Sequence, residues 1–289
     1  MNLTAPSQVA DLLRRHGFRP RKSLGQSFLV DQNVLDRIVD SADLSPEDGV
    51  LEIGAGLGTL SRALAARGRQ VISLEIDRDL IPVLSETTGD LPNLQVVCQD
   101  ALTADIDGLL ETLAGGHIKV VANIPYYVTS PLLELLLERS GRLSLIVLLV
   151  QKEVAQRLVA RPGTPDYGSL TVFAQYHAEA ELVSVVSPKA FLPAPKVESA
   201  ILRLTPRPRR SLSGEDEARF FQVVRAGFSQ RRKTLYNCLR SFPPLGLSSE
   251  LAAQALAQAG IEPRRRGETL SLAEFARVSQ AVESRRAAG

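Results

Sequence analysis

The side chains best suited to chemistry stand at the ends of four predicted strands. In chain order these strand ends carry three glycines, a glutamate, an aspartate and an asparagine: Gly54, Gly56 and Gly58, then Glu75, Asp100 and Asn123. In an open parallel sheet, the carboxyl ends of neighbouring strands form the crevice in which ligands bind. We therefore expect these residues to line one site.

The glycines lie in the run LEIGAGLGTLS, directly after the first of these strands. Glycine at such a turn lets a ligand approach the backbone closely. A nicotinamide-binding loop would have its third glycine at position 59, which is Thr59 here. The tighter spacing, preceded by Glu52, fits better the loop that holds the amino-acid portion of S-adenosylmethionine, although such turns also occur purely for packing.

The two acids extend this interpretation. Glu75 is placed to accept hydrogen bonds from both hydroxyls of a ribose, and Asp100 to accept one from the exocyclic amine of an adenine. The alternative is that each acid caps the helix that follows it. Three consecutive strand ends with glycines, Glu and Asp in this order favour the cofactor interpretation.

The fourth strand ends in Asn-Ile-Pro-Tyr at residues 123–126. If the methyl acceptor is an amino group of a nucleobase, the Asn123 side-chain oxygen and the Pro125 carbonyl can accept hydrogen bonds from its two N–H groups. This geometry localises the nitrogen lone pair and directs it at the methyl sulfonium, so that catalysis depends on orientation and fixed dipoles. Tyr126 then stacks on a base withdrawn from its helix, whereas we assign Tyr127 to core packing.

Strands and helices alternate in the first two thirds of the chain, which is typical of an α/β fold with a doubly wound parallel sheet. The five predicted strands of this sheet span residues 49–54, 70–77, 94–102, 118–127 and 143–151. Two further strands are predicted at 169–187 and 198–206, on either side of the loop PKAFLPAPKV. Later segments have helical periodicity, at 215–229, 231–241, 248–259 and 271–284.

Three segments differ in charge and predict the domain organisation. A basic N-terminal arm, 1–26, has a net charge of +4, and we expect it to become ordered only on binding. The predicted catalytic domain, 27–205, carries −9, and a C-terminal helical domain, 206–289, carries +7. Basic ends around an acidic body indicate a polyanionic partner, and solvated helix faces are the alternative explanation.

Composition limits the class of protein. The 289 residues contain no apolar run long enough for a membrane span, and charges come too early for a secretory signal, so we expect a cytoplasmic protein without a membrane partner. Two distant cysteines and three scattered histidines predict neither a disulfide nor a metal site. Nothing in the sequence requires more than a monomer.

The motifs together resemble the ribosomal RNA adenine dimethyltransferases that modify small-subunit rRNA. The resemblance runs through nearly the whole chain and rests on LGQSFLVDQNVLDRIV, LEIGAGLGTLS, LEIDRDL, QDAL, NIPYYVTSPLL, LLVQKEVAQRL, FLPAPKVESAILRL and FSQRRKTLYNCL. It implies a Rossmann-like S-adenosylmethionine-dependent domain. It also implies transfer of four methyl groups to N6 of two adjacent adenosines, in a hairpin loop near the 3′ end of the rRNA of an assembling small subunit.

The resemblance also implies specific contacts. Carried over by position, the cofactor contacts are Leu29, Gly54, Glu75, Asp100 and Asn123. The family commonly has Asn in the front motif where this chain has Ser27, whose hydroxyl makes a shorter-reaching contact, with Gln26 beside it. Phe191, in the loop that forms the second wall for the target base, is expected to stack on the adenine opposite Tyr126, and a buried loop phenylalanine is the alternative.

Basic clusters in the C-terminal third predict the RNA contacts. Arg231, Arg232 and Lys233 stand at the predicted start of a helix, and further clusters lie at 209–210 and 264–266. Lys and Arg contacts to phosphates supply salt-sensitive affinity with little sequence preference. We expect 231–233 to contribute most, because runs such as 264–266 are often only solvated.

Competing functions remain open at this point. A related activity is adenine N6-methylation of large-subunit rRNA, which confers antibiotic resistance, and the long C-terminal helical domain favours the small-subunit substrate. A different class is a small-subunit assembly factor whose methylation is secondary. Thr59 and the lack of a hydride-handling His/Arg pair disfavour a dehydrogenase, and the motif order disfavours DNA methylation.

Overall fold

The computed structural model describes residues 1–125, 128–207 and 214–287. The chain forms two compact units. The first contains residues 1–155 and 178–206, and the second contains 156–177 and 207–289. Among the described residues, we find no helix that has both the length and the hydropathy needed to span a bilayer.

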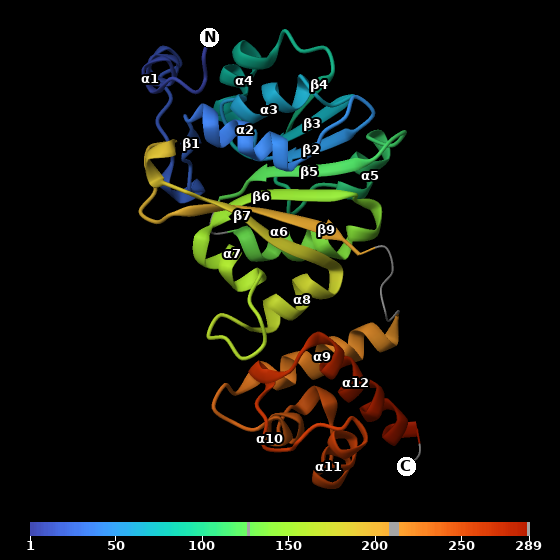
Figure 1. Cartoon of the computed structure of the whole chain (residues 1–289). Coiled ribbons are helices and arrows are strands. Elements are labelled where there is room, and N and C mark those ends of the chain that lie inside the picture. The colour runs from blue at the N-terminus through green and yellow to red at the C-terminus, as the bar shows by residue number, and fades with distance from the viewer. Residues whose placement is uncertain (126–127, 208–213, 288–289) are drawn as a thin grey trace. The chain divides into compact units, whose positions relative to one another are not determined.

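A seven-stranded sheet is the centre of the first unit (Figure 1). In spatial order its strands are β4 (Leu94–Cys98), β3 (Gln70–Glu75), β2 (Gly49–Ile53), β5 (Ile118–Asn123), β6 (Leu145–Gln151), β9 (Ser199–Pro206) and β7 (Ala178–Val186). The first five are parallel, whereas β9 is antiparallel to both of its neighbours. β3 and β4 follow on one side of β2, and β5 and β6 follow on the other side, so the strand order reverses between β2 and β5. Open α/β sheets bind ligands at such a point. The predicted α/β class is confirmed.

The central strands are buried on both faces because helices cover the sheet, as in parallel sheets generally. On one face of the sheet, the helices at 32–41 and 59–65 pack against strand residues such as Val121. The contacting helix residues include Val34, Ile38, Leu60 and Leu64. The helices of this unit are α1 (Pro6–Arg15), α2 (Gln32–Ser41), α3 (Thr59–Ala65), α4 (Ile81–Thr88), α5 (Ile106–Thr112) and α6 (Thr129–Glu138), while α7 (Lys152–Leu158) crosses the unit boundary.

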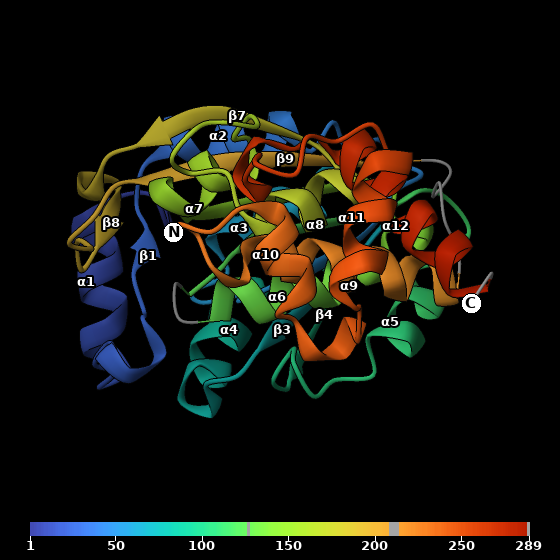
Figure 2. The ribbon, with the colours of Figure 1, turned by 90° about the horizontal axis from the view of Figure 1, so that it is seen from below.

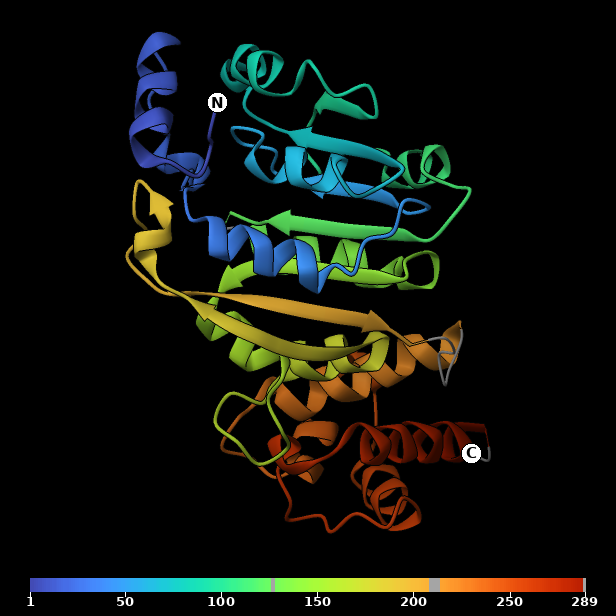
Figure 3. The ribbon, with the colours of Figure 1, turned by 45° about the horizontal axis from the view of Figure 1, so that its top comes forward.

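A second, two-stranded sheet joins distant parts of the first unit. β1 (Phe28–Leu29) pairs antiparallel with β8 (Phe191–Leu192). Figures 2 and 3 show this pair and α1 close together, and Figure 3 places them at the side of the large sheet where β5 and β6 end. The front motif and the PKAFLPAPKV loop are thereby brought to the carboxyl ends of the strands.

The N-terminal segment is folded, which differs from the expected arm. Leu12 and Phe18 pack with Leu80 and Leu84 in one apolar cluster. Ion pairs hold the same segment, since Arg15 lies 2.7 Å from Glu86. Residues 1–26 therefore belong to the first unit, because the apolar face of α1 has a partner in α4.

In the second unit, the regular elements of the described residues are all helices. They are α8 (Ser169–His177), α9 (Glu215–Ser229), α10 (Leu235–Arg240), α11 (Ser249–Gln258) and α12 (Leu272–Ala287). Phe220 and Phe275 are fully buried in its core. The predicted helical C-terminal region is confirmed at each of its four segments, although the helix predicted from residue 231 begins only at Leu235.

One predicted strand is partly wrong. Residues 169–177 form α8, and the strand begins only at Ala178. Val172 and Tyr176 are one helical turn apart and both are buried in the core of the second unit, where the Tyr176 ring stacks on Phe220 at 5.1 Å. Tertiary packing thus overrides the strand preference of a segment rich in β-branched and aromatic residues. It also explains why 156–177 groups with the second unit, although the expected boundary lay at residue 205.

Candidate active site

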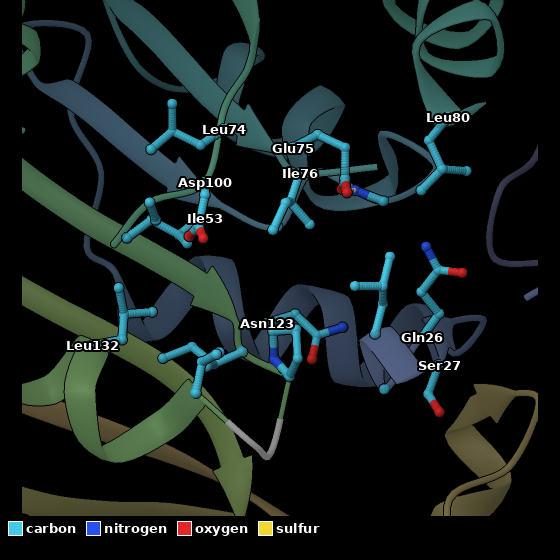
Figure 4. Close-up of a pocket in the computed structure, with 18 of the residues that line it drawn as sticks. Gln26, Ser27, Ile53, Leu74, Glu75, Ile76, Leu80, Asp100, Asn123 and Leu132 are labelled. Carbon is cyan, nitrogen blue, oxygen red and sulfur yellow. Dashed lines mark hydrogen bonds between the residues drawn. The ribbon is translucent and has the colours of Figure 1, made fainter. Parts of the chain in front are cut away.

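A cavity of about 230 Å³ lies at the carboxyl ends of β2, β3, β4 and β5. We call it the active-site pocket. Its lining includes most of the predicted site residues: Ser27, Gly54, Gly56, Glu75, Asp100, Asn123, Pro125 and Phe191. Figure 4 shows Glu75, Asp100 and Asn123 extending toward a common space, with Gln26 and Ser27 across from them. Residues separated by more than 160 positions in the sequence thus share one site.

The glycine loop has two different roles. Gly54 and Gly56 line the pocket with φ of +84° and +58°, values that side-chain-bearing residues rarely adopt. Gly58 is outside the lining, and a Cβ there would lie 2.6 Å from the Thr88 side chain. Gly54 and Gly56 therefore open the backbone to a ligand, whereas Gly58 permits close packing of α3 against α4.

Glu75 is a buried carboxylate with capacity for further hydrogen bonds. Its side chain receives the Gly56 N–H at Oε2 and the Asp77 N–H at Oε1, each at 2.8 Å. A carboxylate has about four acceptor positions, so each oxygen can accept one more donor. Burial raises the pKa of Glu75 above its usual range, and these N–H groups oppose the increase. The arrangement suits two additional donors, such as a pair of vicinal hydroxyls.

A second buried acid, Glu52, lies beneath the loop. It is fully buried, and its Oε2 accepts hydrogen bonds from the hydroxyls of Ser61 on α3 and Ser73 on β3. Its other oxygen, Oε1, accepts none from the residues that the structure describes. Burial raises the pKa of Glu52 to about 7. Glu52 thus connects three elements around the glycine loop without lining the pocket.

Asp100 and two neighbouring apolar residues form another part of the lining. One Asp100 oxygen accepts the Leu102 N–H at 2.9 Å, and the other is available to a ligand amine. Ile76 and Leu102 also line the pocket and leave about 40% of their surface exposed (43% and 37%). Such groups can cover the faces of a planar ring. Sequence reasoning missed both, although each lies within two residues of a predicted acid.

The front motif is held across the pocket by polar contacts. The Gln26 side chain donates to Asp77 Oδ2 at 2.7 Å, and Arg21 forms an ion pair with Asp77 at 2.9 Å. Ser27 lines the pocket beside this tether. The predicted contact Leu29 is placed differently, because its side chain is buried in the apolar cluster of α2 and is not part of the lining.

The end of β5 presents the predicted acceptors. Asn123 and Pro125 line the pocket, and the side-chain amide of Asn123 forms no hydrogen bond with any residue in the described ranges. The Pro125 carbonyl already accepts the Val128 N–H at 3.1 Å, which leaves it one lone pair. Ile124 also lines the pocket, so its carbonyl is a second candidate for the backbone acceptor. Tyr126 and Tyr127 lie outside the described residues.

Phe191 is buried and also lines the pocket, so its position is compatible with both of the roles considered for it. It is 5% exposed and packs in the same apolar cluster as Leu29, yet it also lines the pocket. The ring is therefore held firmly by its neighbours and presents only part of its surface to the cavity. Such a ring can act as a fixed wall for a planar base.

A separate basic surface lies in the second unit, where three loops are joined by hydrogen bonds. The Gly163 N–H donates to the Glu268 carbonyl and the Leu235 N–H to the Arg265 carbonyl, both at 2.7 Å, and the Arg231 guanidinium donates to the Pro165 carbonyl. We call the exposed cations of these loops the basic surface: Arg161, Arg231, Arg232, Lys233, Arg264 and Arg266. Three acids accompany them, namely Asp166, Glu262 and Glu268.

The cations of the predicted clusters differ in their availability. Arg232, Lys233 and Arg264 form no ion pair within the described part of the chain, whereas Arg265 pairs with Glu274 at 2.5 Å. Arg265 lowers the pKa of Glu274 to about 2 through this contact. Residues 231–233 lie in the loop before α10 rather than in the helix, because Thr234 caps it. The cluster at 209–210 lies outside the described residues.

Comparisons with known proteins identify the family. The family model described as ribosomal RNA adenine dimethylase matches residues 17–283. The chain is 46% identical over 284 residues to the ribosomal RNA small subunit methyltransferase A of Geobacillus kaustophilus, and 45% identical over 287 residues to that of Bacillus mycoides, with 97% of each chain covered in both cases.

Two solved structures resemble the fold closely. One is a dimethyladenosine transferase from Plasmodium falciparum, with a TM-score of 0.76, 26% identity, and coverage of 86% of this chain and 95% of that one. The other is the 23S rRNA methyltransferase ErmE, with a TM-score of 0.68, 32% identity, and coverage of 89% and 99%. The chain belongs to the ribosomal RNA adenine dimethylase family.

Proposed function

We propose that this protein uses S-adenosylmethionine to dimethylate N6 of two adjacent adenosines in the 3′-terminal hairpin loop of small-subunit rRNA, within an assembling subunit. The observation that carries the proposal is the convergence of Glu75, Asp100 and Asn123 on one pocket beside a positive-φ glycine loop. The family match and the small-subunit names of relatives near 46% identity support this substrate.

The pocket residues fit the cofactor. Each Glu75 oxygen has a free acceptor position for a ribose hydroxyl, and the free Asp100 oxygen suits an adenine amine. Ile76 and Leu102 provide apolar surface for the adenine ring, and the Gly54–Gly56 turn leaves room for the amino-acid portion. When bound, S-adenosylmethionine supplies a methyl group on a positively charged sulfur.

The residues at the end of β5 orient the acceptor amine. The Asn123 side-chain oxygen accepts one N–H of the adenine amino group, and a carbonyl at Ile124 or Pro125 accepts the other. These two fixed acceptors keep the nitrogen lone pair out of the ring and directed at the methyl group. Phe191 positions the base from one side, and we assign Tyr126 to the other. The methylated nitrogen becomes acidic, so that it releases its proton without a strong base.

The basic surface of the second unit holds the RNA. Its free cations Arg232, Lys233 and Arg264 are available for phosphates, because they have no ion-pair partner in the ranges that the structure describes. Phosphate contacts give affinity without base recognition. Selection of the two adenosines then follows from the shape of the folded subunit, as is common in RNA recognition.

Small subunits that lack the modification provide the test. The protein and S-adenosylmethionine are incubated with them, the rRNA is digested, and dimethyladenosine is located by mass spectrometry. We expect dimethyladenosine at two neighbouring positions, formed about 10²- to 10³-fold more slowly with Asn123→Ala. Methylation of large-subunit RNA alone would instead assign the activity of ErmE, the 23S rRNA enzyme that is 32% identical. Tight subunit binding without methylation would leave an assembly factor.

A further inference from the structure

A second hollow lies beside the active-site pocket in the first unit. It is a groove of about 530 Å³ between the end of α1 and β8, within the size range of sites for small ligands. Leu192 and the small exposed parts of Leu13 and Phe18 (7% and 9% exposed) give it apolar surface. Arg14 and Arg19 provide two guanidinium groups, and no carboxylate is among its described lining residues. Apolar surface with cations and no acid suits a planar anionic ligand.

The groove and the pocket share a thin wall. Phe18 lines the groove and Phe28 lines the pocket, and their ring centroids are 6.2 Å apart. The same division recurs in β8, where Phe191 lines the pocket and the next residue, Leu192, lines the groove. Successive side chains of a strand point to opposite faces. The groove is thus continuous with the wall that positions the target base.

The α1 side of the groove is held to the rest of the first unit. Arg15 and His16 both contact Glu86 at 2.7 Å, and these contacts hold α1 to α4. The Arg15 guanidinium holds the pKa of Glu86 near 2, so that this acid stays ionised at pH values where an ordinary glutamate is protonated. Arg14 pairs with Asp11, whereas Arg19 is exposed and forms no ion pair with a described residue. Arg19 is therefore the cation of this groove that is most available to a phosphate.

We propose that this groove binds the nucleotide next to the target adenosine in the RNA strand. Its base lies against Phe18 and Leu192, and Arg19 contacts the phosphate between it and the target. The proposal rests on the proposed RNA substrate. Contact of a base with an aromatic side chain tolerates any base, because every base has a flat face. While one of two adjacent adenosines is in the pocket, its neighbour thus has a defined place.

Cross-linking tests the location directly and independently of turnover. The protein is bound to unmethylated small subunits with S-adenosylhomocysteine, irradiated with ultraviolet light, digested and analysed by mass spectrometry. We expect nucleotides adjacent to the methylated adenosines on peptides that contain Phe18 or Leu192. Cross-links confined to residues 231–233, or groove peptides cross-linked only to rRNA distant from the two adenosines, would overturn the proposal.

Kinetics with a matched variant provide the second test. Arg19→Ala should raise KM for the subunits about tenfold, as expected for one charge-assisted contact, with kcat and cofactor affinity unchanged. Arg37→Ala removes an exposed arginine of α2, outside the groove, and should leave KM unchanged. Equal KM values for the two variants would refute the proposal that the groove binds the adjacent nucleotide. Failure of the wild-type protein to bind subunits would refute the proposed function, and the groove proposal with it.

Discussion

Glu75 is 5% exposed and receives two backbone N–H groups, whereas Arg232 and Lys233 are exposed and have no ion-pair partner in the described ranges. In the proposed function, the active-site pocket binds its ligand through buried, hydrogen-bonded groups, and the basic surface binds RNA through exposed charges. Fixed buried groups respond to pH, because burial changes their pKa. Exposed charges respond to salt, because ions screen them. Ligand binding in the pocket should therefore depend mainly on pH, and RNA binding at the basic surface mainly on salt concentration.

Asn123→Ala should separate the regions most strongly. Loss of one preorganised polar group is expected to lower the rate of methyl transfer about 10²- to 10³-fold. Binding to small subunits, and its salt dependence, should not change, because the basic surface is intact. Single-turnover methylation and filter binding measure the two quantities. Asn33→Ala, an exposed residue of α2, is the control. If subunit binding fell as much as the rate of methyl transfer, the two regions would not have separate roles.

Glu52→Gln should change how stability depends on pH. The pKa of Glu52 is about 7 in the folded protein and near 4.5 when unfolded. As pH rises between these values, the unfolded chain releases the proton first, so the folded state loses about 3 kcal/mol of stability relative to pH 4.5. This contribution is complete below pH 4.5 and is lost by about pH 7.

Urea denaturation of both proteins from pH 4.5 to 8 gives the measurement. The difference between their unfolding free energies should vary with pH over that interval and be constant above it. Parallel curves would mean that Glu52 does not titrate there. Salt should have little effect on the difference, because the group is buried.

Glu75→Gln should weaken cofactor binding about 10- to 100-fold, since hydrogen bonds to a charged group are worth about 1.5–3 kcal/mol. The amide keeps one acceptor oxygen but places an N–H where a backbone N–H already points. Isothermal titration with S-adenosylmethionine measures the change. Glu111→Gln, on the exposed face of α5, is the matched control. Unchanged affinity would remove Glu75 from the cofactor site.

Alanine at positions 231–233 should have the smallest effect at physiological salt, a severalfold loss of subunit affinity. The slope of log affinity against log salt concentration is negative, and it should become shallower by about 2 to 3. Each cation that contacts a phosphate releases about one counterion. Titrations at several salt concentrations measure the slope. Cofactor affinity should stay the same, and an unchanged slope would place the RNA contact elsewhere.

The sequence predicted the pocket better than its surroundings. Glu75, Asp100 and Asn123 could be placed together because strand ends in a parallel sheet meet at one edge, whatever the side chains around them. The separate role of Gly58 could not be predicted, since only the position of Thr88 distinguishes a packing glycine from a ligand glycine. The helix at 169–177 was missed because its partner Phe220 lies far along the chain. Long-range packing is not visible in local periodicity.

The pairing of β1 with β8 has a consequence for synthesis on the ribosome. Phe28 and Phe191 both line the pocket, and the strands that carry them are separated by more than 160 residues. Contacts of such long sequence separation form late, because a long loop must close first. A nascent chain can build the parallel strands as they emerge, but it cannot complete the pocket wall before residue 192 has left the exit tunnel. The wall assigned to the target base is thus completed only after most of the chain has been translated.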